Sequence, residues 1–211
     1  MSIKITTLVE NSVYGKGLQG EHGLSLLVDT GEHRLLFDTG ASDLFIRNAR
    51  ILGIDLKEVD FLVLSHGHRD HTGGLHHFLA VNDKAQVICK RELFRPKFKD
   101  ERENGVMQPN ALDSTRFRFV DEVTELCRGV FVFPQLPVTD EEDTHFEHFF
   151  TWAEGRKQAD TFTDELALVL KQGAEVSVLS ACSHRGITNI IRAVQEYFPQ
   201  TSLKLVLGGF H

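Results

Sequence analysis

The stretch FLVLSHGHRDHTGGL, residues 61–75, decides how the rest of the sequence is interpreted. A short apolar run leads directly into three histidines and an aspartate, which are His66, His68, Asp70 and His71. Such a run is typical of a strand covered on both faces. Without a ligand, the neighbouring imidazoles would repel one another when protonated and would need several partners when neutral. The motif therefore predicts a divalent-metal site at the end of a buried strand.

The glycines of this stretch favour an extended or turning loop. In such a loop His66 and His68 point to one side, while Asp70 and His71 point elsewhere. This arrangement serves two metal ions a few ångströms apart. Imidazole nitrogens with a carboxylate suit Zn²⁺, and Fe and Mn accept the same donors. The predicted cofactors are two divalent ions, with zinc preferred.

Composition limits the classes of protein to consider. The chain has 211 residues, of which 41% are hydrophobic and 25% charged, and its net charge is −7. The negative charge argues against non-specific attraction to nucleic acid or an anionic membrane. No apolar run approaches the roughly 20 residues of a membrane-spanning helix, and the N-terminus MSIKITTLVENS lacks a signal-peptide core. Three widely spaced cysteines (Cys89, Cys127 and Cys182) make no disulfide framework, so we expect a cytoplasmic protein.

Apolar periodicity predicts strands and helices that alternate in two halves. The expected strands are 3–9, two within 23–40, 61–65, 85–90, 129–133, 165–170, 175–181 and 203–207, and the expected helices are 42–52, 73–82 and 186–198. This order suggests two mixed sheets packed face to face with helices outside, an α/β (α+β) arrangement. Residues 92–160 include long polar stretches without a sustained period and are interpreted as a variable loop or lid region.

His66-Gly67-His68-Arg69-Asp70-His71 resembles the HxHxDH signature of the metallo-β-lactamase superfamily. The segments VENS, EHGLSLLVDTG, LSHGHRDHTGG, DELALVL, CSHRGITN and LGGFH are together similar to the branch of 7,8-dihydropterin-6-yl-methyl-4-(β-D-ribofuranosyl)aminobenzene 5′-phosphate synthase-like proteins. The resemblance implies one domain over residues 1–211, an αββα sandwich with a dinuclear site along one edge. Because relatives continue beyond GGFH, it also suggests that this domain is truncated at its C-terminus.

The resemblance implies a ligand set drawn from both halves of the chain. The expected metal ligands are His66, His68, Asp70, His71, His184 and His211, the last two standing after predicted strands of the second half. Asp70 and His68 are also the expected catalytic residues. Asp70 would orient or accept a proton, whereas His68 would act through its metal and not as an acid or base.

The sequence departs from the family pattern at two places and leaves their roles open. Where relatives carry a bridging aspartate, this chain has Cys182, either a thiolate ligand or, as we favour, a small buried hydrophobe. Where relatives carry a further histidine, it has Asp164 and Glu165, which ligate, position substrate or cap a turn. In the matching segments, Asp38 would contact a ligand from behind and His22 would line the site.

Other suggestive features receive ordinary interpretations. The segment GKGLQG, residues 15–20, matches a dinucleotide-binding motif by its letters. A strand-like stretch follows it where that motif requires a helix, so we interpret it as a glycine-rich loop. The remaining histidines are expected at the surface, and they are His33, His76, His77, His145 and His148.

Three functions remain open from the sequence. The first is a metal-dependent hydrolase, in which metal-activated water attacks a small ester or phosphoester. The second is a transferase that joins a dihydropterin diphosphate to an aminobenzene ribofuranosyl phosphate. For it, five basic residues either contact phosphate or form a solvated edge, and they are Lys90, Arg91, Arg95, Lys97 and Lys99. The third is a non-hydrolytic metal-binding or redox module. The expected partner is a small molecule, phosphorylated or pterin-like; no partner nucleic acid or membrane is expected, and the sequence does not indicate an oligomeric state.

Overall fold

The first half of the chain forms a six-stranded sheet in the order β1-β2-β3-β4-β5-β8. A computed structural model describes residues 3–210. The strands of this sheet are β1 (Lys4–Val9), β2 (Ser25–Asp29), β3 (Arg34–Phe37), β4 (Phe61–Val63), β5 (Gln86–Cys89) and β8 (Phe117–Phe119). β1, β2 and β3 pair antiparallel, and β3, β4, β5 and β8 pair parallel. Parallel strands end at the same edge, so Asp38 after β3 meets Ser65 after β4.

The second half forms a five-stranded sheet in the order β15-β14-β13-β10-β9. Its strands are β9 (Thr124–Cys127), β10 (Val130–Phe133), β13 (Ala167–Gln172), β14 (Glu175–Ser180) and β15 (Ser202–Gly208). β14 and β15 are parallel, and the other pairs are antiparallel. Because β13 and β14 run in opposite directions, the start of β13 and the end of β14 lie at one edge. This places Glu165 close to His184.

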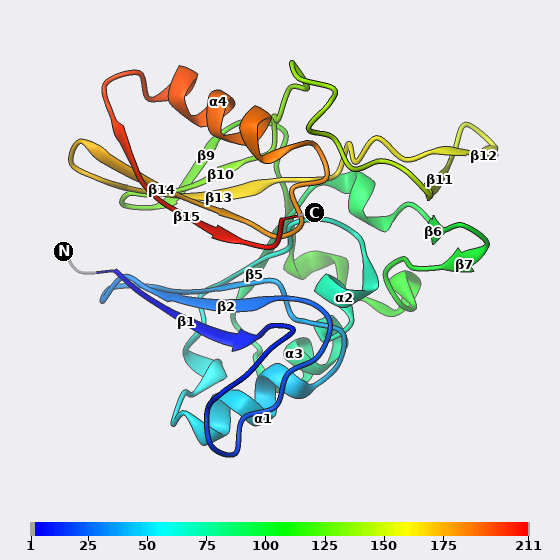
Figure 1. Cartoon of the computed structure of the whole chain (residues 1–211). Coiled ribbons are helices and arrows are strands. Elements are labelled where there is room, and N and C mark those ends of the chain that lie inside the picture. Colours follow the sequence, from blue (N-terminus) through cyan, green and yellow to red (C-terminus); the bar gives the residue numbers. More distant parts are fainter. Residues whose placement is uncertain (1–2, 211) are drawn as a thin grey trace.

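Alternation along the strands divides the apolar side chains between three cores. Leu26, Phe37 and Leu168 belong to the core between the two sheets. The intervening Leu36 packs toward α1 (Leu44–Ile51) and α3 (Leu75–Val81), and Val169 packs toward α4 (Ile187–Tyr197). In Figure 1, α4 lies over the second sheet, while α1 and α3 lie over the first. The structure thereby confirms the predicted αββα sandwich.

A third, smaller sheet was not predicted from the sequence. It has four strands in the order β12-β11-β6-β7, and we call it the small sheet. Its strands are β6 (Lys97–Lys99), β7 (Arg102–Glu103), β11 (Phe149–Ala153) and β12 (Arg156–Ala159). They lie within the region interpreted as a variable loop or lid, and they extend to one side of the sandwich (Figure 1). Strands of two to five residues are too short to show a period of their own.

Short helical turns complete the structure. They are α2 (Arg69–Thr72) and the 3₁₀ turns η1 (Leu56–Glu58), η2 (Arg91–Phe94), η3 (Pro109–Ala111) and η4 (Ser114–Arg116). α2 begins inside the histidine motif, directly after His68. Over residues 3–210, none of the helices combines the length and apolar character needed to cross a bilayer.

Candidate metal centre

Asp38 joins the two strand ends that carry the first part of the site. It is fully buried and has a positive φ of 59°. Its Oδ1 accepts a hydrogen bond from the Ser65 backbone N–H at 2.7 Å. Its Oδ2 accepts from the Ser65 hydroxyl at 2.6 Å and from Nδ1 of His71 at 2.8 Å. One carboxylate therefore holds both ends of the histidine motif.

These contacts decide which nitrogen of each imidazole carries a hydrogen. The Ser65 hydroxyl hydrogen points to Asp38, so Ser65 Oγ accepts from Nδ1 of His66, 2.9 Å away. Nδ1 of His71 also carries a hydrogen, because its partner is a carboxylate. In the neutral form of both rings the lone pair is then on Nε2, as metal ligation requires.

His184, after β14, is held in a comparable way by the second sheet. Its backbone N–H donates to Oε1 of Glu165 at 2.9 Å, and the Arg185 N–H donates to Oε2 at 2.8 Å. Burial raises the pKa of Glu165 to about 7, although these two N–H groups oppose the shift. Nδ1 of His184 lies 3.1 Å from the carbonyl oxygen of His145, which only accepts, so the lone pair is again on Nε2.

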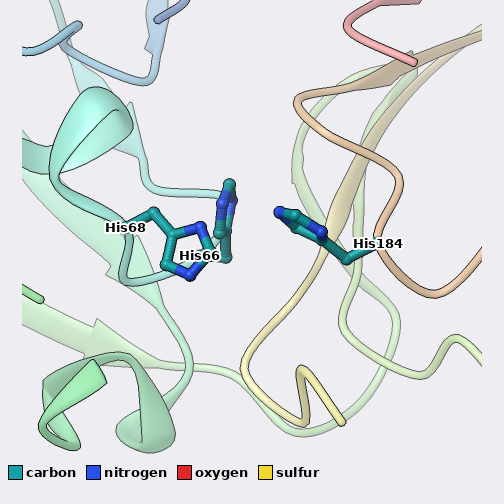
Figure 2. A group of neighbouring side chains, drawn as sticks. All are labelled: His66, His68 and His184. Atoms are coloured by element: carbon teal, nitrogen blue, oxygen red, sulfur yellow. The ribbon is translucent and has the colours of Figure 1, made fainter. Parts of the chain in front are cut away.

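Three imidazoles from these two loops face one another. Figure 2 shows His66 and His68 opposite His184. The ring centroids are 4.8 Å apart for His66 and His68, 5.2 Å for His66 and His184, and 5.1 Å for His68 and His184. One donor atom from each ring lies within 4.8 Å of the others, as a bound metal ion would need.

The nitrogen atoms of this group test whether a cation fits. Nε2 of His66 and Nε2 of His68 are buried and have no hydrogen-bond partner among residues 3–210. A buried polar atom without a partner costs about 1–3 kcal/mol. Burial lowers the pKa of His66 well below its ordinary value, helped by the neighbouring imidazoles, and burial lowers the pKa of His68 to about 3, helped by Lys97. Both rings are therefore neutral at pH 7, as metal ligands must be.

A second group of donors surrounds Nε2 of His71. The Cys182 sulfur lies 3.1 Å from this nitrogen, and Oδ2 of Asp70 lies 3.2 Å from it. His66, His71 and Cys182 together have the spacing of a metal site. Burial alone would lower the pKa of His71, but Cys182, Asp70 and Asp38 outweigh it and raise that pKa well above its ordinary value. The same groups that stabilise a proton on Nε2 of His71 would also stabilise a metal cation at that nitrogen.

The sulfur of Cys182 thus lies beside the His71 ring and not in an apolar core. Of the two roles considered from the sequence, this position suits a thiolate ligand. His211, the other ligand expected from the second half, lies outside the described residues.

Asp70 stands between the buried imidazoles and the surface. Burial would raise its pKa, but His71, His68 and His22 outweigh that effect and hold the pKa well below its usual range. Its Oδ2 lies 3.4 Å from Nε2 of His22, whose side chain is 82% exposed. The carboxylate is therefore charged at neutral pH and accessible from one side.

A pocket of about 370 Å³ opens over both donor groups and is lined by His68, Cys182 and His184. Phe149 forms part of its wall, with its ring centroid 4.9 Å from that of His68. The rim carries three exposed cations, which are Arg69, Lys99 and Arg102. Of the described residues that line the pocket, Asp70 alone is acidic. The pocket therefore suits a small anionic molecule.

The five basic residues grouped by the sequence analysis are separated in the structure. Nζ of Lys90 donates to the Pro134 carbonyl, Arg91 lies over the Phe119 ring, and Arg95 pairs with Glu92. Lys97 is buried, and Lys99 alone among the five lines the pocket.

Arg69, Arg102 and Phe149 were not singled out from the sequence. Arg69 lies inside the HxHxDH motif, which could have drawn attention to it, whereas no local signal marks Arg102 or Phe149.

The remaining described histidines do not line the pocket. His33 is paired with Asp60, and the exposed His148 is paired with Asp100. Nε2 of His76 lies 2.9 Å from the Met107 carbonyl oxygen. His77 is exposed, and His145 offers its carbonyl oxygen to the His184 ring.

Comparisons with known proteins agree with the sandwich fold. The family model of the metallo-beta-lactamase superfamily matches residues 18–164. An uncharacterized protein of Methanocaldococcus jannaschii is 30% identical over 98% of this chain and 78% of its own length. The 7,8-dihydropterin-6-methyl-4-(beta-D-ribofuranosyl)-aminobenzene-5′-phosphate synthase of the same organism is 28% identical over 100% of this chain and 78% of its own length.

Among solved structures, a metal-dependent hydrolase of the beta-lactamase superfamily is 34% identical, with a TM-score of 0.84 over 100% of this chain and 77% of that chain. The family model covers most of the chain, and these relatives align over nearly all of it. The chain therefore belongs to the metallo-beta-lactamase superfamily, as its HxHxDH motif predicts.

Proposed function

We propose that the protein is a metal-dependent hydrolase that uses two divalent cations to cleave a small anionic ester or phosphoester. The observation that carries this proposal is the pair of buried Nε2 atoms on His66 and His68, which lack a hydrogen-bond partner among residues 3–210. Buried neutral imidazoles whose Nε2 atoms lack a hydrogen-bond partner are suited to bind a cation.

Two groups of residues would hold the cations. The first is His66, His68 and His184, and the second is Asp70, His71 and Cys182. Nitrogen, oxygen and sulfur donors together suit zinc better than the harder manganese. Cations bound there would polarise a carbonyl or phosphoryl oxygen and make hydroxide available at neutral pH.

The chain's own side chains orient the reactants and exclude water. Asp70, charged at pH 7, accepts hydrogen bonds from groups that enter the pocket. His22, largely exposed, places its Nε2 3.4 Å from Oδ2 of Asp70 and so helps to orient that carboxylate. Phe149 and Phe162 pack on the His68 ring with centroid distances of 4.9 and 5.1 Å, which keeps water from its inner face.

A second candidate function is a synthase, and two observations favour it. The synthase relative aligns with the whole of this chain. The cationic rim of Arg69, Lys99 and Arg102 would accept a phosphate or a diphosphate as readily as a carboxylate. In that reaction the same pocket would place an aryl amine beside the carbon that bears a diphosphate leaving group.

Metal analysis followed by an activity screen tests both functions. We expect about two equivalents of zinc per chain in the purified protein, in line with two-metal sites. Turnover of phosphodiesters, thioesters or lactones supports the hydrolase, whereas coupling of a pterin diphosphate to an aminobenzene riboside phosphate supports the synthase. Bound metal with neither reaction points to the metal-binding or redox module. A protein free of Zn, Fe and Mn contradicts both enzyme functions.

The cationic rim predicts how substrate selection responds to mutation. In Arg102→Ala and Lys99→Ala variants we expect KM for a phosphorylated substrate to rise about tenfold, since an ionic hydrogen bond contributes roughly 1.5–3 kcal/mol and these side chains are partly screened. KM for an uncharged analogue should stay unchanged. Steady-state kinetics with both substrates measures this, and Arg118→Ala, an exposed arginine outside the pocket, is the matched control. Equal effects on both substrates would contradict the role of the rim.

A further inference from the structure

The two residues next to His68, Gly67 and Arg69, both donate their backbone N–H groups to residues outside the motif. The Gly67 N–H donates to Oδ2 of Asp164 at 2.7 Å. The Arg69 N–H donates to the carbonyl oxygen of Asn104 at 3.0 Å. The backbone of this expected ligand is therefore fixed before and after its own residue.

Lys97 connects these two acceptors. Its Nζ donates to Oδ1 of Asp164 at 2.7 Å. Its carbonyl oxygen accepts from the Asn104 N–H at 2.8 Å. Hydrogen bonds through Asp164, Lys97 and Asn104 thus connect Gly67 with Arg69, the residues before and after His68. A Cβ atom on Gly67 would lie 3.0 Å from Cε of Lys97 and 2.3 Å from the Leu93 carbonyl oxygen, so lysine and loop are in close contact.

The lysine is buried, which is uncommon for this residue type unless it is paired. Its side chain is 2% exposed, and Nζ also donates to Oδ2 of Asp160 at 2.7 Å. Asp160 and Asp164 are buried as well. Burial alone would lower the pKa of Lys97, but the two carboxylates outweigh it and raise that pKa. One ammonium and two carboxylates leave a net negative charge beside the histidine cluster.

We propose that Lys97 and Asp164 are positioning residues, which set His68 for its cation and attach the small sheet to the histidine motif. The inference rests on the proposed function, because it assumes that the motif holds a metal. Lys97 opens β6, where it faces Thr151 of β11, and Lys99 faces Phe149 two residues further on. The strand that carries Lys99 therefore starts at the lysine that fixes His68, and it pairs with the strand that carries Phe149. Cation affinity and pocket shape are coupled through this one side chain.

Two buried aspartates provide a matched test of this inference. Asp160 and Asp164 each accept from Nζ of Lys97 at 2.7 Å, and each also accepts a backbone N–H, from Phe162 at 2.8 Å and from Gly67 at 2.7 Å. Asp164 contacts the histidine motif, and Asp160 does not. Asp164→Asn and Asp160→Asn therefore make the same chemical change to one lysine but differ at the metal loop.

The measurement is the affinity of the metal-free chain for Zn²⁺ and Co²⁺, by competition with a chelator, together with the visible spectrum of bound Co²⁺. We expect affinity to fall about 10- to 100-fold in Asp164→Asn, as for other groups that orient metal ligands, with a changed Co²⁺ spectrum. Asp160→Asn should stay within about threefold of the unsubstituted protein while losing similar thermal stability. Lys97→Met, which fills the same space without charge, should match Asp164→Asn. Lys157→Met, which removes a lysine of the same sheet that contacts Asp100 and Glu101, should change nothing.

Four outcomes separate the possibilities. Unequal affinities in the expected order support the positioning role. Equal affinities in Asp164→Asn and Asp160→Asn overturn it, since both carboxylates would then serve stability alone. If Asp164→Asn does not fold, the comparison of Lys97→Met with Lys157→Met decides in the same way. Failure of the unsubstituted chain to bind Zn²⁺ or Co²⁺ contradicts the proposed function itself.

Discussion

Replacing His68 by alanine is expected to lower kcat/KM by at least about a thousandfold. The change removes a donor from the first group, and transition-state stabilisation by a bound cation contributes several kcal/mol, with each 1.36 kcal/mol equal to a factor of ten. The metal content should fall by about one equivalent per chain. Steady-state kinetics and elemental analysis of the same preparation measure both effects.

His33→Ala is the matched control for this prediction. His33 lies at the turn between β2 and β3, is paired with Asp60 and does not line the pocket. We expect unchanged metal content and turnover in this variant. Full turnover in His68→Ala would show that the first donor group has no part in the reaction.

Asp38→Asn is expected to weaken metal binding by the second donor group (Asp70, His71 and Cys182), although Asp38 is not itself a donor. The carboxylate accepts from Nδ1 of His71 and from both donors of Ser65. An asparagine keeps one acceptor oxygen and turns an N–H₂ group toward the remaining partners. The lowest-cost response is for His71 to move its hydrogen from Nδ1 to Nε2, which removes the lone pair that a metal needs. We expect metal affinity to fall about 10- to 100-fold, with a larger fall in kcat.

The position of the His71 hydrogen is directly measurable by ¹⁵N NMR of the metal-free protein. In the neutral ring, which is reached only at high pH because the pKa of His71 is raised, the unsubstituted chain should carry the hydrogen on Nδ1 and Asp38→Asn should carry it on Nε2. Asp60→Asn, which alters an aspartate paired with His33 at the other end of these strands, serves as the control. An unchanged tautomer together with unchanged metal affinity would contradict the role assigned to Asp38.

Much of the sandwich could be predicted because its central strands are continuous apolar runs, as expected of strands covered on both faces. Leu35 and Phe37 face one core and Leu36 faces another, so all three are apolar. The small sheet has no such pattern. β6 is three residues long, and its partner β11 lies far along the chain. Pairing at that distance depends on how the rest of the chain folds, so local sequence does not reveal it.

In the site, too, features that are local in sequence could be predicted and features that depend on strand pairing could not. His66, His68, Asp70 and His71 are adjacent in sequence, and their chemistry is evident from their spacing. Asp164 and Glu165 were noticed, but their contacts with backbone N–H groups depend on strand registers that the sequence does not show.

Cys182 shows the remaining limit of prediction from sequence. A cysteine side chain can pack as a small hydrophobic residue or can bind a metal through its sulfur. What favours one role is its place 3.1 Å from Nε2 of His71, a distance set by two sheets together.

The two donor loops are braced separately, His71 by Asp38 from the first sheet and His184 by Glu165 from the second. A cation between them is therefore a cross-link between halves of the molecule that are distant in sequence. Closing a long loop lowers chain entropy before any contact is gained, so such a link forms late, once both sheets exist. The metal-free chain should therefore keep both sheets and loosen first between the loops that carry His71 and His184.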